Sequence, residues 1–212
     1  MPFSIQDKIE SFYDEFSKLR LKVLRLRKDF HNIKKDIDVL DKRGFGVLSD
    51  RDITDRLISG NLTIAYVQDE QMQPASVDLT LGYSLKKLDG TEINLREGDY
   101  ILQPNEFILG STSEKVEIPD DLVGQVDGKS SIARLGVEVH RTAGWIDPGF
   151  KGNITLEIHN GGDKPFTLSW EMPICQIIFF TLTSPCERPY GHDELNNHYQ
   201  NSDGTVLSRY GE

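Results

Sequence analysis

The hydrophobic period changes at Gly60, and this change restricts the fold more than any other feature of the chain. Beyond Gly60 the apolar residues fall in short runs typical of β-strands, separated by turn-forming pairs such as Asp89-Gly90 and Gly161-Gly162. The runs lie at 62–66, 76–81, 107–109, 122–126, 137–139, 154–158 and 174–182. Many short strands at this spacing predict an all-β barrel or jelly roll, with helices only at the start of the chain.

The first 43 residues have a helical period instead. Apolar residues recur in alternating steps of four and three, a heptad pattern sustained over about five repeats. They are Ile5, Ile9, Phe12, Phe16, Leu19, Val23, Leu26, Phe30, Ile33, Ile37 and Leu40. No Gly or Pro interrupts the pattern between Phe3 and Arg43, and Gly44 and Gly46 then supply a stop. We predict one long helix that packs against copies of itself or, alternatively, against its own domain.

A short second helix is predicted over 49–59. Ser49 is a good N-cap with Asp52 three positions later, and Gly60 ends the pattern. The sequence beyond 190 is polar, rich in Asn, His and Tyr, and suits a segment that folds over a ligand. The predicted domains are a heptad helix at 1–43, a β domain at 44–190 and a closing tail at 191–212.

The net charge of −10 is distributed unevenly. Residues 1–43 hold 11 Lys and Arg against 8 Asp and Glu, or +3, which leaves 13 against 26, or −13, for residues 44–212. A domain this acidic is a poor nonspecific binder of nucleic acid, so nucleic acid is not an expected partner. The basic side chains of the long helix form a solvated face or, alternatively, contact an acidic partner.

Composition also indicates the compartment. Two cysteines, Cys175 and Cys186, cannot form a disulfide framework or a Cys-rich zinc site, and we expect both to be reduced. No apolar run approaches the ~18 residues that span a bilayer. The first residues lack the basic-then-apolar layout of a signal peptide. We expect a cytoplasmic protein with no membrane partner.

The densest chemistry lies between Gly128 and Asn160. A hydroxyl-rich turn carries two cations, a later turn carries an acid, and an apolar strand pattern contains a glutamate. These residues are Lys129, Ser130, Ser131, Arg134, Asp147 and Glu157. Alternation puts Thr155 and Glu157 on one strand face, which looks either into a pocket or out to water. The combination predicts a site for a polyanionic ligand.

Two familiar nucleotide motifs are excluded. Gly128-Lys129-Ser130 resembles the end of a Walker A loop, but Gly124 lies one residue too close for that motif. The Pro-Cys-x-x-Cys element of zinc deaminases is absent, and the histidines have no ligand-like spacing. We therefore expect no protein-bound metal.

Three ordered motifs carry a resemblance to a known family. They read QPASVDLTLG at 73–82, GKSSIARLG at 128–136 and HRTAGWIDPGFKGNITLE at 140–157. These resemble the motifs of the dCTP deaminase family, which belongs to the dUTPase-like superfamily, and the match covers about 48–209. The resemblance implies a mainly β, distorted jelly-roll or β-barrel subunit of the dUTPase-like type. It also implies a homotrimer whose active sites are shared between neighbouring chains. The long N-terminal α-helix lies outside the family pattern.

The resemblance further implies an activity and a set of roles. The activity is hydrolytic deamination of dCTP to dUTP and ammonia without zinc, with Mg²⁺ held mainly by the triphosphate and dTTP as a candidate inhibitor. Glu157 would be the general base, supported by Ser130 and Arg134, and Ala143 would line the pocket for base and water. Asp147 would bind the 3′-hydroxyl of the deoxyribose. The implied nucleotide contacts are Lys129, Ser130, Ser131, Ile132, Ala133, Arg134, Asp147, Thr155, Gln176, Tyr190, His198 and Ser202.

Several departures and alternatives remain. Lys129 stands where the family usually has Arg, while His198 and Ser202 replace a common Lys and Gln of the closing segment. The turn at 143–147 and the run at 182–190 resemble members that carry dUTP on to dUMP and pyrophosphate. The alternatives to a deaminase are thus a bifunctional deaminase and diphosphatase, a dUTPase alone, or a nucleotide-sensing regulatory protein.

Overall fold

A computed structural model describes two units of the chain, 1–44 and 45–212. The described residues are 18–20, 22–23, 25–30, 33 and 46–210. In the first unit every described residue is helical, and the heptad positions Leu19, Leu26 and Phe30 are 60%, 59% and 70% exposed. The rest of the predicted helix lies outside the described residues. No helix in the described part of the chain is long and apolar enough to cross a membrane.

The second unit begins with helix α2 (Asp50–Ser59), which its flanking residues define. The Ser49 hydroxyl accepts a hydrogen bond from the Asp52 N–H at 3.3 Å, and the Asp52 carboxylate accepts one from the Ser49 N–H at 3.4 Å. This reciprocal capping box satisfies two N–H groups at the helix start. Gly60 adopts φ 73°, a left-handed conformation that ends the helix.

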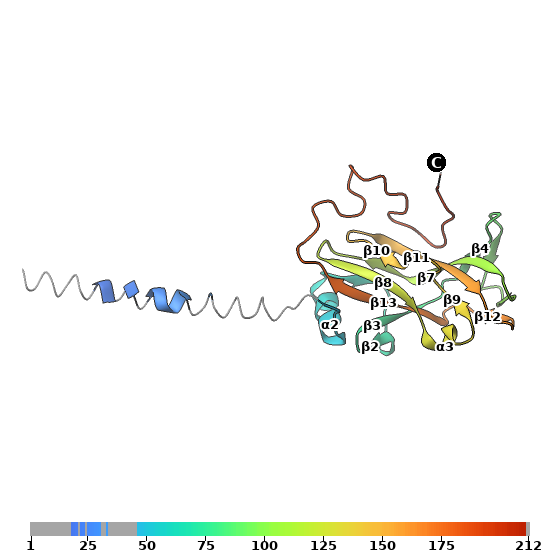
Figure 1. Cartoon of the computed structure of the whole chain (residues 1–212), viewed down its shortest axis with the longest axis horizontal. Helices are drawn as coiled ribbons and strands as arrows, with labels where there is room; N and C mark the ends of the chain where they lie inside the picture. The colour runs from blue at the N-terminus through green and yellow to red at the C-terminus, as the bar shows by residue number, and fades with distance from the viewer. Residues whose placement is uncertain (1–17, 21, 24, 31–32, 34–45, 211–212) are drawn as a thin grey trace, which may run out of the picture. The chain divides into compact units, whose positions relative to one another are not determined.

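Two sheets form the body of this unit (Figure 1). The first has the order β5-β4-β7-β11-β9, with β1 also paired to β7. Its strands are β1 (Thr63–Ile64), β4 (Ser84–Lys86), β5 (Glu92–Asn94), β7 (Phe107–Glu117), β9 (Val137–Glu138) and β11 (Lys151–Asn160). The second has the order β10-β8-β13-β3-β2. Its strands are β2 (Met72–Gln73), β3 (Ser76–Thr80), β8 (Leu122–Gly128), β10 (Trp145–Ile146) and β13 (Pro173–Thr181).

Smaller elements complete the unit. A third, two-stranded sheet pairs β6 (Tyr100–Leu102) with β12 (Phe166–Leu168), and the short helices are η1 (Asp69–Gln71) and α3 (Ser130–Ala133). One apolar core joins the sheets; Ile108, Leu156 and Phe179 within it are completely buried. The mainly β prediction is confirmed, and within the described residues the strands form open sheets and do not close into a barrel.

Strand β7 bulges against β11 near the middle of the unit. The register pairs Asn153 with Lys115 and Thr155 with Ser111, so β7 advances four residues while β11 advances two. Extra residues in one strand lose their ladder partners and bend it. The hydroxyl of Thr112 compensates in part, since it accepts the Ile154 N–H at 3.0 Å.

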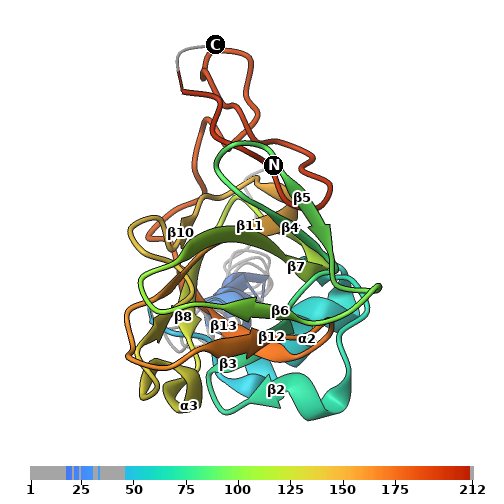
Figure 2. The same ribbon diagram turned by 90° about the vertical axis from the view of Figure 1, so that its right-hand side faces the viewer.

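The C-terminal tail runs over the end of the unit that carries β10 and β11 (Figures 1 and 2). Its main chain adds to the start of β11: the Asn153 N–H donates to the Ser202 carbonyl at 3.0 Å, and the Asn201 N–H donates to the Lys151 carbonyl at 2.8 Å. Gly152 has φ 140°, and a Cβ there would lie 2.7 Å from the Ser202 nitrogen. Only glycine permits this approach.

Candidate active site

Glu157 lies on β11 opposite Leu109 of β7. Its side chain is half-buried, and Oε2 accepts hydrogen bonds from the backbone N–H groups of Arg141 and Thr142, each at 3.0 Å. Among the described residues, none donates a hydrogen bond to Oε1. One oxygen of the carboxylate is therefore fixed in place, while the other is available to a ligand or water.

A cavity of about 520 Å³ opens beside this carboxylate. Besides Glu157, five residues that the sequence singled out line it, and they are Ala143, Asp147, Thr155, Tyr190 and Ser202. Apolar side chains such as Leu109, Ile146 and Phe150 form much of the remaining wall. A mostly apolar pocket with a few convergent polar groups is the usual character of a small-molecule site. The strand face that carries Thr155 and Glu157 thus looks into a pocket.

The tail encloses one side of this cavity. Tyr190 packs edge-on against Phe150, with ring centroids 5.7 Å apart, and its hydroxyl accepts the Tyr199 N–H at 3.1 Å. The Ser202 hydroxyl donates to the Tyr199 carbonyl at 2.6 Å, so it stabilises a turn within the tail. His198 is not among the residues that line the cavity; its ring packs against that of Tyr199.

A second group of predicted residues gathers around α3. Lys129 is the N-cap of this short helix, and its ammonium forms an ion pair with Asp78 of β3. Gln176 of β13 pairs with both neighbouring strands; its Oε1 accepts the Ser76 hydroxyl at 2.8 Å, and its amide lies 3.4 Å from the Gly128 carbonyl. These contacts hold the turn that carries the cation.

The hydroxyl-rich turn presents its polar side chains outward. Ser130, Ser131 and Arg134 are exposed, and among the described residues the Arg134 guanidinium has no partner. Ala133 is also exposed, whereas the Ile132 side chain is buried in the core and anchors the turn. The turn is therefore fixed by an apolar residue while its cation and hydroxyls stay available.

Within one chain, the two groups of residues remain apart. None of the described residues that line the Glu157 cavity comes from 128–136 or from β13. The predicted site residues of one chain thus form two groups, a carboxylate-bearing cavity and a cationic turn. Over the described ranges, no group of three or more His, Cys, Asp or Glu side chains is arranged to hold a metal ion.

Two residues of these surroundings were not predicted from the sequence. Asp78, which pairs with Lys129, lies in the first motif, but only the structure brings the two motifs together. Asn153 lies four residues before Glu157 on the same strand face and lines the same cavity. The period-2 pattern that singled out Thr155 and Glu157 also contained Asn153 and could have identified it.

Comparison with solved structures supports the fold. A 2′-deoxycytidine 5′-triphosphate deaminase from Agrobacterium tumefaciens is similar with a TM-score of 0.57. The match has 22% sequence identity and covers 65% of this chain and 49% of that one. At this identity the likeness shows the fold alone, and the chain shares the mainly β fold of that deaminase.

Sequence comparison gives the family. A family model described as dCTP deaminase-like matches residues 47–182. A "dCTP deaminase, dUMP-forming" from Halobacterium salinarum is 46% identical over 184 residues, covering 77% of this chain and 94% of that protein. A "dCTP deaminase" from Halorubrum lacusprofundi is 44% identical over 186 residues, covering 78% of this chain and 91% of that protein. The three motifs, the fold and these matches agree, and the chain therefore belongs to the dCTP deaminase-like family.

Proposed function

We propose that the protein deaminates dCTP hydrolytically and carries the dUTP on to dUMP and pyrophosphate. The observation that carries the first step is the carboxylate of Glu157, anchored through one oxygen and open through the other at the wall of a largely apolar cavity. The second step is favoured by relatives that are 42% to 46% identical and are described as dUMP-forming. The leading expectation from the motifs, dUTP as the final product, is the alternative.

In the proposed deamination, the free Oε1 of Glu157 takes a proton from water. The oxygen of that water forms a bond to C4 of the cytosine while the C4=N3 double bond opens, and N3 takes the electron pair and later the second proton of the water. The same carboxyl group then returns the proton to the amino nitrogen, the C4–N bond breaks, and ammonia leaves, so that dCTP and water give dUTP and ammonia. A base that must later act as an acid needs a fixed position, which the Arg141 and Thr142 N–H groups provide.

The remaining contacts follow from position along the cavity. Asp147 and Ala143 line it with Glu157, which suits binding of the sugar hydroxyl and the base. Lys129, Ser130, Ser131 and Arg134 supply the charge and hydroxyls that a triphosphate requires. Because this turn does not line the cavity of its own chain, we propose that it reaches the cavity of a neighbouring copy in a homotrimer.

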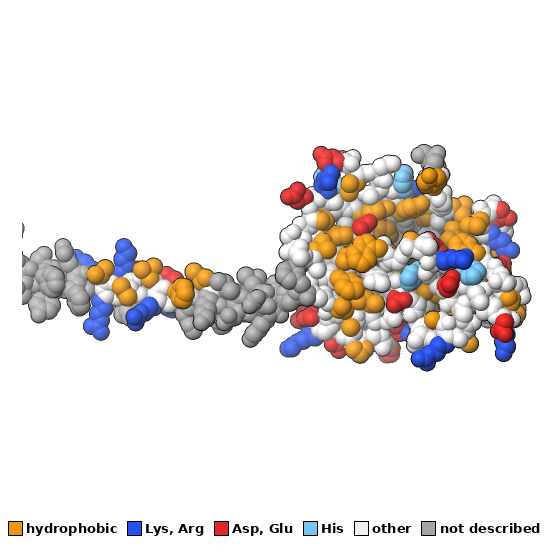
Figure 3. All heavy atoms as spheres, in the orientation of Figure 1, with side chains coloured by type: hydrophobic (Ala, Val, Ile, Leu, Met, Phe, Trp, Pro, Cys, Tyr) orange, Lys and Arg blue, Asp and Glu red, His pale blue; other side chains and the backbone are white. Residues whose placement is uncertain are grey.

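An exposed apolar surface supports such contact between copies. Hydrophobic side chains gather on the face of the β unit shown in Figure 3. Trp145 of β10 is 58% exposed although it stacks on Phe180 at 6.3 Å. Exposed aromatic residues of this kind are enriched at protein interfaces. We further propose that the heptad helices of three chains pack together along the trimer axis.

The helix proposal can be tested by changing its stripe. Leu19→Asp combined with Leu26→Asp places charges in the proposed seam. Light scattering should then show that the trimer dissociates at a higher protein concentration than the trimer of the unchanged protein. The matched control, Lys22→Asp with Arg25→Asp, changes charge away from the apolar positions. Equal assembly of the seam variant and the unchanged protein would refute the bundle.

In this scheme, magnesium would enter the site bound to the nucleotide. With no protein cluster for a metal in the described ranges, the ion would be held mainly by phosphate oxygens, and it would neutralise charge on the triphosphate. In the second step, water attacks the phosphorus nearest the sugar and pyrophosphate leaves, which converts dUTP and water into dUMP and pyrophosphate.

One assay separates these alternatives. The protein is incubated with dCTP or dUTP plus Mg²⁺, and ammonia, dUTP, dUMP and pyrophosphate are followed in time. Ammonia with dUMP and pyrophosphate is expected from dCTP. Accumulation of dUTP with ammonia would select the deaminase alone, and dUMP from dUTP without ammonia from dCTP would select a dUTPase. No turnover of either nucleotide would overturn the proposal.

A further inference from the structure

One face of β11 carries a row of three polar side chains, Asn153, Thr155 and Glu157, and all three line the same cavity. The first two bind the tail. Asn153 Oδ1 accepts the Gly204 N–H at 3.0 Å, and Thr155 Oγ1 accepts the Val206 N–H at 3.3 Å. The carboxylate that ends the row is thus next to a tail fixed by its two neighbours.

The bulge of β7 fixes the orientation of the Asn153 amide. Nδ2 of Asn153 donates toward the carbonyl oxygens of Thr112, Ser113 and Glu114 at 2.9, 3.3 and 3.2 Å. These carbonyls are the ones that the bulge removes from the strand ladder, and buried carbonyls need partners. Because Nδ2 must face three acceptors, Oδ1 must face the opposite way, toward the tail.

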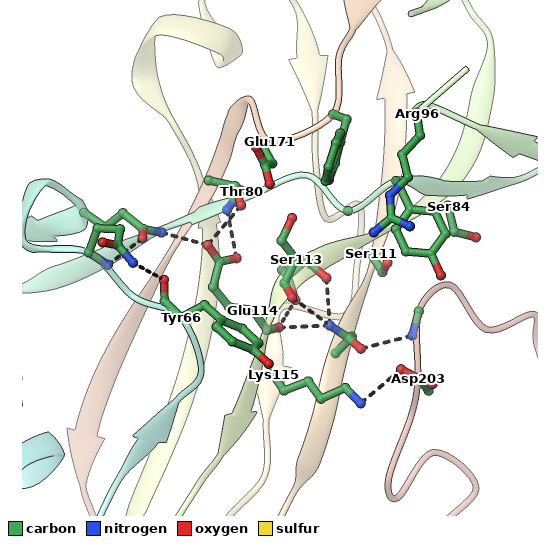
Figure 4. Close-up of a pocket in the computed structure, with 18 residues that line it drawn as sticks. Tyr66, Thr80, Ser84, Arg96, Ser111, Ser113, Glu114, Lys115, Glu171 and Asp203 are labelled. Atoms are coloured by element: carbon green, nitrogen blue, oxygen red, sulfur yellow. Dashed lines mark hydrogen bonds and ion pairs between the residues drawn. The ribbon is translucent and has the colours of Figure 1, made fainter. Parts of the chain in front are cut away.

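A second side-chain contact between β7 and the tail is weaker than the hydrogen bond from Gly204 to Asn153. Lys115 of β7 and Asp203 of the tail form an ion pair at 3.0 Å, visible in Figure 4, but their side chains are 51% and 85% exposed. Ion pairs in water contribute little. Asn153 is only 6% exposed, so its hydrogen bonds do not compete with solvent. The amide therefore holds this part of the tail more firmly than the ion pair does. A second buried contact is made by the Thr205 hydroxyl, which donates to the Ser84 carbonyl at 2.5 Å.

We propose that Asn153 is a positioning residue, which sets tail residues 202–208 over the cavity and so shapes the wall that faces the Glu157 carboxylate. It acts through the tail and takes no part in proton transfer. The role in turnover rests on the proposed deaminase function, whereas the attachment of the tail can be measured without any substrate.

The test compares Asn153→Ala with Thr112→Val. Thr112→Val removes a hydroxyl that supports the bulge, bonding the Ile154 N–H and the Glu114 carbonyl, yet it leaves the tail contact intact. In Asn153→Ala, hydrogen exchange of the Gly204 and Val206 amides should accelerate roughly 10-fold, and KM for dCTP should rise by a similar factor, with a smaller change in kcat. In Thr112→Val the melting temperature should fall while the exchange of both amides stays unchanged.

The outcomes are distinct. Unchanged tail exchange in Asn153→Ala would overturn the proposal, and so would equal acceleration in Thr112→Val, because the effect would then pass through the bulge. Should Asn153→Ala not fold, Asn153→Ser keeps a hydroxyl beside the β7 carbonyls but is too short to reach the Gly204 N–H, and the same acceleration is expected. If the unchanged protein releases no ammonia from dCTP, the proposed function fails while the exchange data still test the attachment.

Discussion

Two glutamates on the paired strands β7 and β11 have opposite surroundings. Glu114 is 3% exposed, and its carboxylate accepts hydrogen bonds from the Gln71 amide at 2.7 Å and from the Thr80 N–H and hydroxyl, both at 3.0 Å (Figure 4). Both oxygens of that carboxylate have partners. Glu157 is half-buried, and only one of its oxygens has partners within the described residues.

This difference separates a carboxylate whose acceptor sites are occupied within the fold from one that is available for the proposed chemistry. The donors to Glu114 come from η1 and β3, so its side chain connects the two sheets. It does so at the wall of a second cavity of about 650 Å³, which Trp170 and Glu171 also line. The donors to Glu157 come from one adjacent loop and hold it without saturating it. The residue type is the same, and the two carboxylates differ in how many of their acceptor sites are occupied.

The largest expected effect is on turnover. Glu157→Gln keeps an oxygen that can accept the Arg141 and Thr142 N–H groups but removes the proton acceptor, so ammonia release should fall by roughly 10²–10⁴-fold. Binding of dCTP, measured by calorimetry, should persist. Ammonia release comparable to that of the unchanged protein would remove Glu157 from its proposed role.

Next in size is an effect on stability alone. In Glu114→Gln, one carboxylate oxygen becomes an NH₂ group that faces the donors of Thr80 or Gln71, which should lower the unfolding free energy by about 1–3 kcal/mol in a urea titration. Turnover per folded molecule should be retained. The control is Glu171→Gln, an exposed residue at the same cavity, which should change stability by less than about 0.5 kcal/mol. If Glu114→Gln and Glu171→Gln lowered the unfolding free energy by the same amount, the buried hydrogen bonds of Glu114 would not explain its effect.

The smallest expected effect concerns pH. Burial, followed by the charges of Glu114 and Asp78, raises the pKa of the Cys175 thiol. A raised pKa means that folding favours the neutral thiol. The contribution of this thiol to the free energy of unfolding is therefore complete below the unfolded pKa of about 8.5, and it is lost as pH rises above that value. Unfolding free energy should fall by about 1 kcal/mol between pH 8.5 and 9.5.

Cys175→Ala should remove most of that slope. Cys186→Ala is the control, because its thiol is nearer to water, although burial raises its pKa as well. If the slope were the same in both variants, the loss of stability would have another source. The measurement is a urea titration at several pH values.

The sequence predicted the strands that consist of apolar runs and missed strands that are polar or very short. The runs at 122–126 and 174–182 correspond to β8 and β13, which are central in their sheet. Only the first three residues of β7 were recognised, since Ser111 to Lys115 read as polar. Pairing with β11 on both sides of the bulge continues the strand to Glu117. Strands β4, β5, β6, β10 and β12 have two or three residues each, too few to show a period.

For the candidate site, motifs predicted residue types better than partners. Glu157 was identified because a glutamate is rarely buried within an apolar strand unless it has a partner or a function. The motifs did not show which residues line the cavity and which lie on the cationic turn, since residues within one 33-residue stretch end in two places. The attachment of Asn153 depends on β7 carbonyls about forty positions away, as the separation of Thr112 and Asn153 shows. Such contacts arise from strand register.

The close approach of Gly152 to Ser202 has a consequence for how the closing segment can evolve. The tail is attached at that point through main-chain groups, which every residue possesses. This main-chain attachment does not depend on which side chain residue 202 carries. A residue such as His198 can replace another type without dislodging the segment, so ligand preference and closure can diverge separately, provided that position 152 has no side chain.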